Sequence, residues 1–232
     1  MKVLLSIFLL LLSLGPASGA IAHVQSKACW ATAFPMTCAF AGDTTGGNLI
    51  IVAVRVVETG GVITGITDTG ANPYVLAVSS GPGWGVSKVY IYYAVNIVGG
   101  ANTVSVAITG TWGASMAIHE YSGLHLASPL DQVSAAQGVS GAGDSGAQTT
   151  TLADELVFGA EISNMTLAGL QGAGFTARVS ENFGGGLLTE EKIVSSIASY
   201  SAAFQDNASV WIAAMATFKM APAGGARRRV IE

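Results

Sequence analysis

The sequence has little charge and few of the residues that usually carry chemistry. Only 10% of its residues are charged, and 10 Lys and Arg against 14 Asp and Glu give a formal net charge of −4. Outside Arg227–Arg229 there is no cluster of basic side chains, which argues against nucleic acid as a partner. The 3 histidines and 2 cysteines are too few and too dispersed to supply the ligands of a metal cluster.

Long amphipathic helical patterns are also missing, and short alternating patterns take their place. Apolar and polar residues alternate in Val89–Val95, as in a strand with one buried face. The alternation resumes in Thr103–Thr109 after the glycine-containing turn Val98–Asn102, which predicts a hairpin, and Met116–Tyr121 adds a third strand. We expect these three strands to form one sheet with a shared apolar face.

Other segments are apolar on both faces. Asn48–Val57 has this pattern and should be a central strand, and Asp154–Ser163 repeats it. The phrase ADELVFGAE at the second strand faintly echoes GGNLIIVAV at the first, as two similar halves of a sandwich would, but it is too short to establish a repeat. With Ser209–Lys219, about a dozen strands predict one all-β domain over residues 20–219, a two-layer antiparallel β-sandwich.

The two ends of the chain differ from this domain. Lys2, an apolar run and the small residues Gly15–Ala20 predict an export signal over residues 1–19, cut near Gly19 or Ala20; an uncleaved anchor is the alternative. The apolar run is too short to span a bilayer comfortably, so we expect no membrane span after cleavage. Residues 220–232 lack periodicity and are predicted to be a disordered tail, with its arginines as an alternative contact for an anionic surface.

Export has a consequence for the two cysteines. A secreted, extracellular or cell-surface location is oxidising, so Cys29 and Cys38 predict a disulfide.

Eight phrases resemble a loosely defined group of exported bacterial domains of cell-surface proteins. They run from Gly47 to Lys219 and read GNLIIVAV, ITDTGANPYVLAV, IYYAVNIVGGANTVSVAI, HEYSGL, PLDQVSAAQG, ELVFGAE, GAGFTARV and WIAAMATFK. The resemblance implies a jelly-roll-like β-sandwich of the lectin and carbohydrate-module kind. It implies no established catalytic residues.

Two constellations are candidate ligand sites. Asp68, Thr69 and Asn72 present several oxygens within a short loop, as some calcium sites do, although a plain turn uses the same residues. No other cofactor is expected. Trp84 and Trp112 lie in turns, where an indole ring can stack on a sugar; the alternative is that each packs as a lid over the sandwich.

One acidic residue falls on a face expected to be buried. Alternation places Glu120 on the side of Met116 and Ile118, where a carboxylate must be hydrogen-bonded, paired or metal-bound. We expect backbone amides or a cation such as Arg55 or Arg178 as its partner. The spacing to the next histidine does not fit a zinc-protease helix, so the neighbouring His119 is interpreted as an ordinary sheet residue.

These observations favour a non-catalytic surface or extracellular module that acts in adhesion or assembly, with glycans or other surface proteins as partners. Three alternatives stay open. The first is a carbohydrate-binding module that uses the loop tryptophans, and the second is a self-associating coat or fibre subunit. The third is a glycoside-active enzyme, which would need two of Glu120, Glu161 and Glu181 facing each other across a groove.

Overall fold

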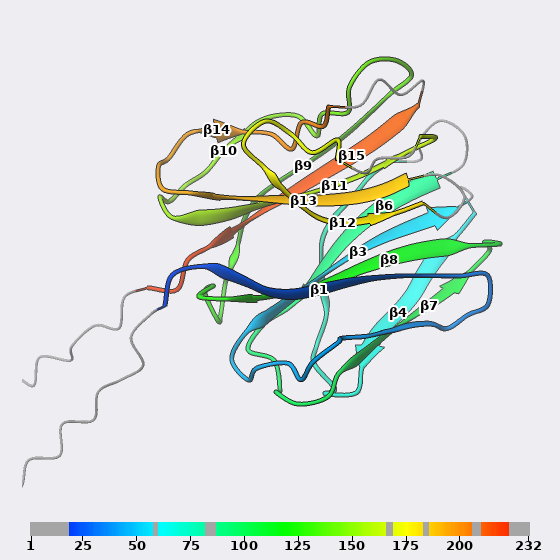
Figure 1. The fold of residues 1–232 in the computed structure, drawn as a ribbon, viewed down its shortest axis with the longest axis horizontal. Coiled ribbons are helices and arrows are strands. Elements are labelled where there is room, and N and C mark those ends of the chain that lie inside the picture. Colours follow the sequence, from blue (N-terminus) through cyan, green and yellow to red (C-terminus); the bar gives the residue numbers. More distant parts are fainter. Residues whose placement is uncertain are drawn as a thin grey trace, which may run out of the picture.

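The computed structural model describes residues 19–57, 60–81, 87–165, 169–182, 186–205 and 210–222. The regular structure of these residues is entirely β, in antiparallel sheets (Figure 1). The strands are β1 (Ala22–Ala31), β2 (Met36–Ala39), β3 (Leu49–Val57), β4 (Val62–Asp68), β5 (Val75–Ser79), β6 (Ser87–Ala94), β7 (Thr103–Thr109), β8 (Ala114–Ser122), β9 (Leu130–Gly138), β10 (Gln148–Thr149), β11 (Glu155–Ser163), β12 (Thr176–Glu181), β13 (Gly186–Val194), β14 (Ser199–Tyr200) and β15 (Trp211–Lys219). Among these residues, none forms a helix long and apolar enough to cross a membrane.

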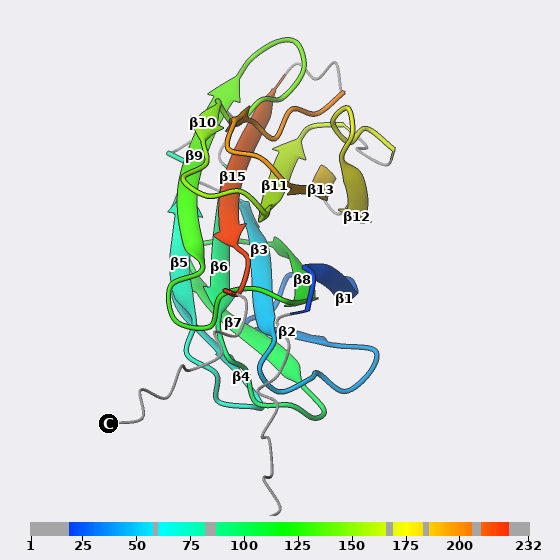
Figure 2. The ribbon, with the colours of Figure 1, turned by 90° about the vertical axis from the view of Figure 1, so that its left-hand side faces the viewer.

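Three sheets are stacked as layers. The central sheet has the order β1-β8-β3-β6-β5, and the facing sheet has the order β12-β13-β11-β15-β9. The third sheet, β2-β7-β4, covers the other side of the central sheet (Figures 1 and 2). The predicted all-β antiparallel sandwich is therefore confirmed, and the third sheet adds a layer to it. The jelly-roll-like topology stays a prediction.

The two-sided apolar pattern of β3 explains the stacking. Leu49, Ile51 and Ala53 pack into the core between the central and facing sheets. Ile50 and Val52 pack into a second core against the third sheet. Because a strand with two apolar faces is stable only when both are covered, β3 lies at the centre of the molecule, as its sequence predicts.

The predicted hairpin between β6 and β7 is wrong. β6 pairs with β3 and β5 in the central sheet, whereas β7 pairs with β2 and β4 in the third sheet. The shared three-stranded sheet of β6, β7 and β8 is wrong for the same reason. Alternation reports which face of a strand is buried, but it does not report which strand lies beside it. The turn Val98–Asn102 passes from one layer to another.

Other predicted boundaries shift slightly. Met220, expected in the tail, still pairs with Leu124, and Ala221 N donates to a backbone carbonyl at 2.8 Å. The predicted export signal falls almost wholly outside the described residues, as does most of the predicted tail.

The central and facing sheets have the same strand order. In the central sheet β1 is an edge strand, and β8 lies between it and the fully buried β3. In the facing sheet β9 is the edge, and β15 lies between it and the fully buried β11. Beyond β3 the central sheet continues with β6 and β5, and beyond β11 the facing sheet continues with β13 and β12. Aligned by their bulges, the two sheets match Glu120 with Thr217 and Leu49 with Leu156, and residues matched in this way are called counterparts.

Candidate functional site

Three tryptophans lie at strand ends that meet at one end of the stacked sheets. Trp30 is near the end of β1, Trp112 precedes β8, and Trp211 begins β15. Pairing places the start of β8 and the end of β1 beside the end of β3, and the start of β15 beside the end of β11. We call this the tryptophan end. Trp84, expected to contribute to a glycan site, lies outside the described residues.

A row of aromatic and polar side chains crosses the central sheet at this end. Trp30 lies directly opposite Ser115 on β8, and Ser115 lies directly opposite Arg55 on β3. Residues opposite each other on neighbouring antiparallel strands project from the same face, so these three side chains form one line, which we call the Trp30 row. Ser115 Oγ donates to Oε2 of Glu181 on the facing sheet at 2.5 Å, which shows that the row faces the space between the two sheets.

Exposure changes along the Trp30 row. The Trp30 side chain is 55% exposed, whereas Ser115 and Arg55 are buried. Burial lowers the pKa of the Arg55 guanidinium, and the nearby carboxylate of Glu181 acts in the opposite direction. Trp112, three residues before Ser115, is 49% exposed. The site therefore combines accessible indole rings with anchored polar groups, the combination that orients a ligand with an apolar face and a polar edge.

The disulfide fixes the strand that carries Trp30. Cys29 and Cys38 are bonded, as predicted, and join β1 to β2. Because Trp30 follows Cys29 directly, the bond restrains the backbone from which the exposed indole projects.

Trp211 has a different role from the other two. It lies opposite Gly138 in register, and a Cβ added at that glycine would come within 2.5 Å of the indole ring. Its Nε1 donates to the backbone oxygen of Ser140 at 3.1 Å. Trp211 is therefore held against the end of β9 and the loop that follows it.

The facing sheet shows what the fold requires at these positions. The counterpart of the Trp30 row is Gln137, Ile212 and Ile162, which also lie directly opposite one another. Two of these three residues are apolar. A sheet of the same strand order is thus built without a buried arginine and serine, so the polar composition of the Trp30 row is not a requirement of the architecture.

Asp68, one of the residues predicted to bind calcium, is surrounded by hydrogen-bond donors. Its carboxylate accepts from Asn72 N (2.9 Å), Asn72 Nδ2 (2.7 Å), Tyr74 Oη (2.9 Å) and Asn102 Nδ2 (2.9 Å). Burial alone would raise the pKa of Asp68, but these bonds outweigh it and hold the pKa below its ordinary value. Thr69 Oγ1 donates to a backbone carbonyl. A cation would have to displace several of these donors, so the geometry favours the plain turn that ties β4 to the start of β7.

Glu120 is buried, as the alternation predicts, and it is held by neutral donors. Its Oε1 accepts from Thr45 N (2.8 Å) and Asn48 Nδ2 (2.6 Å), and its Oε2 accepts from Gln25 Nε2 (2.7 Å). The expected backbone-amide partner is confirmed. These bonds close the end of the sheet opposite to the tryptophan end.

The cations expected beside Glu120 lie elsewhere. Arg55 is in the Trp30 row, and Arg178 forms an ion pair with a different carboxylate, that of Glu191. The carboxylates considered for glycoside hydrolysis are separated too: Glu161 lies on the outer side of the facing sheet, beside Gly143, and Glu181 lies at the tryptophan end. This arrangement gives no support to an acid and base pair across one groove.

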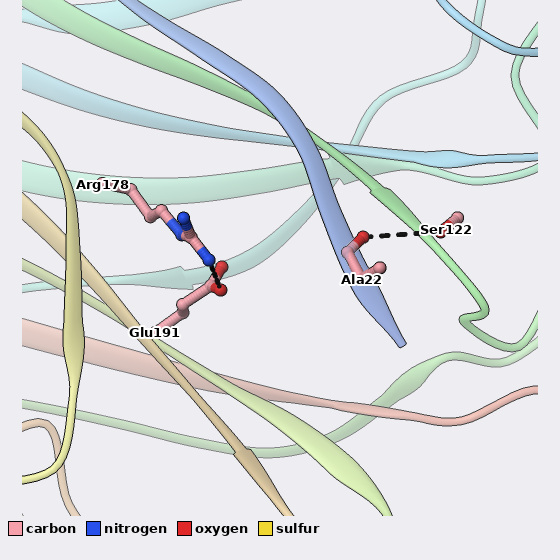
Figure 3. Close-up of polar contacts among 4 residues, drawn as sticks. All are labelled: Ala22, Ser122, Arg178 and Glu191. Carbon is pink, nitrogen blue, oxygen red and sulfur yellow. Dashed lines mark hydrogen bonds and ion pairs between the residues drawn. The ribbon is translucent and has the colours of Figure 1, made fainter. Parts of the chain in front are cut away.

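A second polar cluster lies where β1 meets β12. Figure 3 shows Arg178 turned toward Glu191, with β1 beside them. His119 and Tyr121 are fully buried nearby, and the ring of His23 lies 5.4 Å from that of Tyr121 and 6.3 Å from that of His119, measured between centroids. Both nitrogens of His119 lack a hydrogen-bond partner among the described residues. The strand position of His119 was predicted, but nothing in the sequence indicated this grouping.

The surroundings of His119 favour its neutral imidazole form. Burial lowers the pKa of His119 well below its ordinary value, and the nearby His23 and Arg178 lower it further. Across the described part of the chain, no three His, Cys, Asp or Glu side chains are grouped closely enough to hold a metal ion.

Compared with known proteins, the chain matches no family model, no curated protein and no solved structure.

Proposed function

We propose that the protein is a non-catalytic extracellular binding module that holds its ligand at the Trp30 row, and that the ligand is a carbohydrate. The observation that carries the proposal is the register Trp30–Ser115–Arg55 with Glu181 across from it. Adhesion or assembly at a cell surface is the role that such a module would serve.

The chemistry of the row suits a sugar. One face of a pyranose ring carries C–H groups that pack on an indole, and its edge carries hydroxyls that exchange hydrogen bonds with charged and hydroxyl side chains. An exposed Trp30 supplies the first contact, and the half-buried carboxylate of Glu181, held in place by Ser115, supplies the second. Trp112 extends the apolar surface at the same end.

A glycan array followed by titration calorimetry tests the proposal. The unaltered protein is expected to bind at least one class of oligosaccharide. Trp30→Ala should weaken that binding by about tenfold or more, roughly 1.4 kcal/mol, because exposed tryptophans at contact surfaces contribute strongly. Trp112→Ala should weaken it less.

Gln137→Ala is the matched control, because Gln137 occupies the counterpart of the Trp30 position on the facing sheet and is also exposed. This control should bind like the unaltered protein. Equal losses in Trp30→Ala and Gln137→Ala, or no binding to any glycan, would remove the proposal.

Self-assembly is a second candidate, favoured by one edge of the central sheet. β5 is an edge strand, and its side chains Val75 and Leu76 are exposed. An apolar edge strand is a template for pairing with another chain. Light scattering across a range of concentrations checks this: assembly should appear as rising mass and should be lost in Val75→Lys, whereas a constant monomer mass rejects it.

A further inference from the structure

We infer that the chain is a fused homodimer. Residues 21–124, the first copy, and residues 128–221, the second copy, are two versions of one β unit. The inner face of each copy's five-stranded sheet is the docking surface for the other copy. This inference rests on the fold alone and does not depend on the proposed function.

Strand order gives the first argument. The two five-stranded sheets have the same order when their strands are matched along the chain. The matched pairs are β1 with β9, β8 with β15, β3 with β11, β6 with β13 and β5 with β12. Outside these sheets, β2 pairs with β7 in the first copy, and β10 pairs with β14 in the second. The exception is β4, for which the described residues of the second copy contain no named strand.

Hydrogen-bond register gives the second argument. The ladder between β5 and β6 is interrupted by a bulge between Leu76 and Val78, and the ladder between β12 and β13 is interrupted between Ala177 and Val179. The two bulges lie at the same place in their sheets. Leu76 lies opposite Tyr92, which lies opposite Val52 on β3. Ala177 lies opposite Glu190, which lies opposite Gly159, the counterpart of Val52 on β11. Bulges are specific features of a fold rather than random defects, so their agreement indicates common origin.

A second bulge agrees in the same way. On β1 the ladder shifts between His23 and Gln25, opposite Glu120. On β9 it shifts opposite Thr217, which is the counterpart of Glu120 on β15. A polar side chain on the neighbouring strand accepts a hydrogen bond at each bulge. Glu120 accepts from the side chain of Gln25, and Thr217 Oγ1 accepts from the backbone N–H of Gln132 at 3.0 Å.

Packing between the copies gives the third argument, because their edge strands meet reciprocally, although β6 lies against β15 whereas its counterpart β13 lies farther from β8. The same face of each copy enters one core: Leu49 and Ile51 of the first copy meet in it with their counterparts Leu156 and Phe158 of the second. β1 lies against β12, and β9 lies against β5, which is the exchange that a two-fold axis between the sheets requires.

The copies have diverged where their side chains meet. At the β1–β12 contact Tyr121 lies near Glu191, whose charge raises the pKa of the tyrosine further after burial has raised it well above its ordinary value. The counterpart pair is apolar: Phe218 packs edge-on against Tyr93, with 5.5 Å between the ring centroids. Sequence identity survives at a few counterpart positions, among them Leu49 and Leu156, Ala53 and Ala160, Gln25 and Gln132, Ala117 and Ala214, and Val78 and Val179.

Each copy alone would expose the apolar inner face of a five-stranded sheet. Burial of such a face is the main stabilising term in a sandwich, so each copy needs a partner of the same shape. Fusion supplies that partner at high effective concentration, through the linker 125–127, in which Leu126 and Ala127 are exposed.

Cleavage of the complete chain at two alternative places tests the inference. One variant carries a protease site in the linker at Ala127, and the matched control carries the same site at Gly141, in an exposed loop inside the second copy. Each is purified intact, checked by circular dichroism, cleaved, unfolded in urea and returned to buffer. The linker-cut fragments should reassemble into a 1:1 complex, and tenfold dilution should lower its apparent stability by about 1.4 kcal/mol.

The Gly141-cut fragments should not reassemble, because that cut divides one unit. Failure of the linker-cut pair, or equal recovery in both variants, would overturn the inference. If either insertion prevents folding, an experimental structure decides: the five strands of one copy must superpose on those of the other by a rotation of about 180°. A markedly different rotation would overturn it as well.

Discussion

Replacing Glu190 by glutamine should stabilise the protein at alkaline pH and not at acid pH. Glu190 is fully buried on β13, and its Oε2 accepts from Gly172 N at 2.6 Å while its Oε1 has no partner among the described residues. Burial raises the pKa of this carboxyl from 4.5 to about 7, although the bond from Gly172 acts in the opposite direction. The folded protein therefore favours the protonated form.

The sign and size of the effect follow from this pKa. The stability linked to Glu190 is fully present below the unfolded pKa of 4.5 and is lost as the pH rises through about 7. The difference corresponds to roughly 3 kcal/mol at 1.36 kcal/mol per pKa unit. Glutamine keeps an acceptor for Gly172 but buries an unpaired amide, which costs about 1 kcal/mol. Glu190→Gln should therefore gain about 2 kcal/mol at pH 8 and lose about 1 kcal/mol at pH 4.

Urea denaturation of both proteins at pH 4 and pH 8 measures the two differences. Other groups titrate in this range, but their contributions cancel when the variant is compared with the unaltered protein at each pH. Glu155→Gln is a matched comparison, because burial also raises the pKa of Glu155 to about 7, and it should show the same sign. An effect of Glu190→Gln that does not change with pH would refute the reasoning.

Three further variants test other parts of the structure. Replacing Cys29 and Cys38 together by serine should cost roughly 2.5–3 kcal/mol of unfolding free energy and make stability insensitive to reductant, because the bond closes a short loop. Phe158→Ala should cost about 3–5 kcal/mol in urea denaturation, since the ring is fully buried between the central and facing sheets. The stability linked to neutral His119 is present above about pH 6.5 and is lost as the pH falls below it. His119→Ala puts alanine where the counterpart Ala216 stands in the facing sheet. This variant should lose less stability between pH 7 and pH 5 than the unaltered protein. Equal acid sensitivity of the two proteins would contradict this.

The sequence predicts the strands of this fold better than their neighbours. β3 and β15 were located by residues that alternate or are apolar on both faces, and burial imposes those patterns directly. The pairing of β6 with β3 was missed, because a turn such as Val98–Asn102 can lead to the next strand of a sheet or to another layer. Which of the two occurs depends on contacts with residues far away in the sequence.

The Trp30 row was missed for a related reason. Trp30 was not among the predicted site residues, and its neighbours Ser115 and Arg55 come from distant parts of the chain. Its partner across the sheets, Glu181, was considered only as a catalytic carboxylate. The one usable signal was Arg55, a charged residue within an otherwise apolar central strand.

The echo between GGNLIIVAV and ADELVFGAE coincides with the register that aligns the two sheets, but it is a weak signal. It covers only β3 and β11, and the identities elsewhere are single residues. Two sheets can keep the same order and the same bulges while most side chains change, because backbone hydrogen bonds depend little on side-chain identity. The agreement therefore becomes visible only when pairing is known.

An experimental structure of the protein with its best-binding oligosaccharide tests the central claim most directly. The account predicts one bound chain per molecule, with a sugar ring stacked on the indole of Trp30 and its hydroxyls directed at the carboxylate of Glu181. A sugar bound instead at the counterpart positions around Gln137, or at the end of the sheets closed by Glu120, would contradict it.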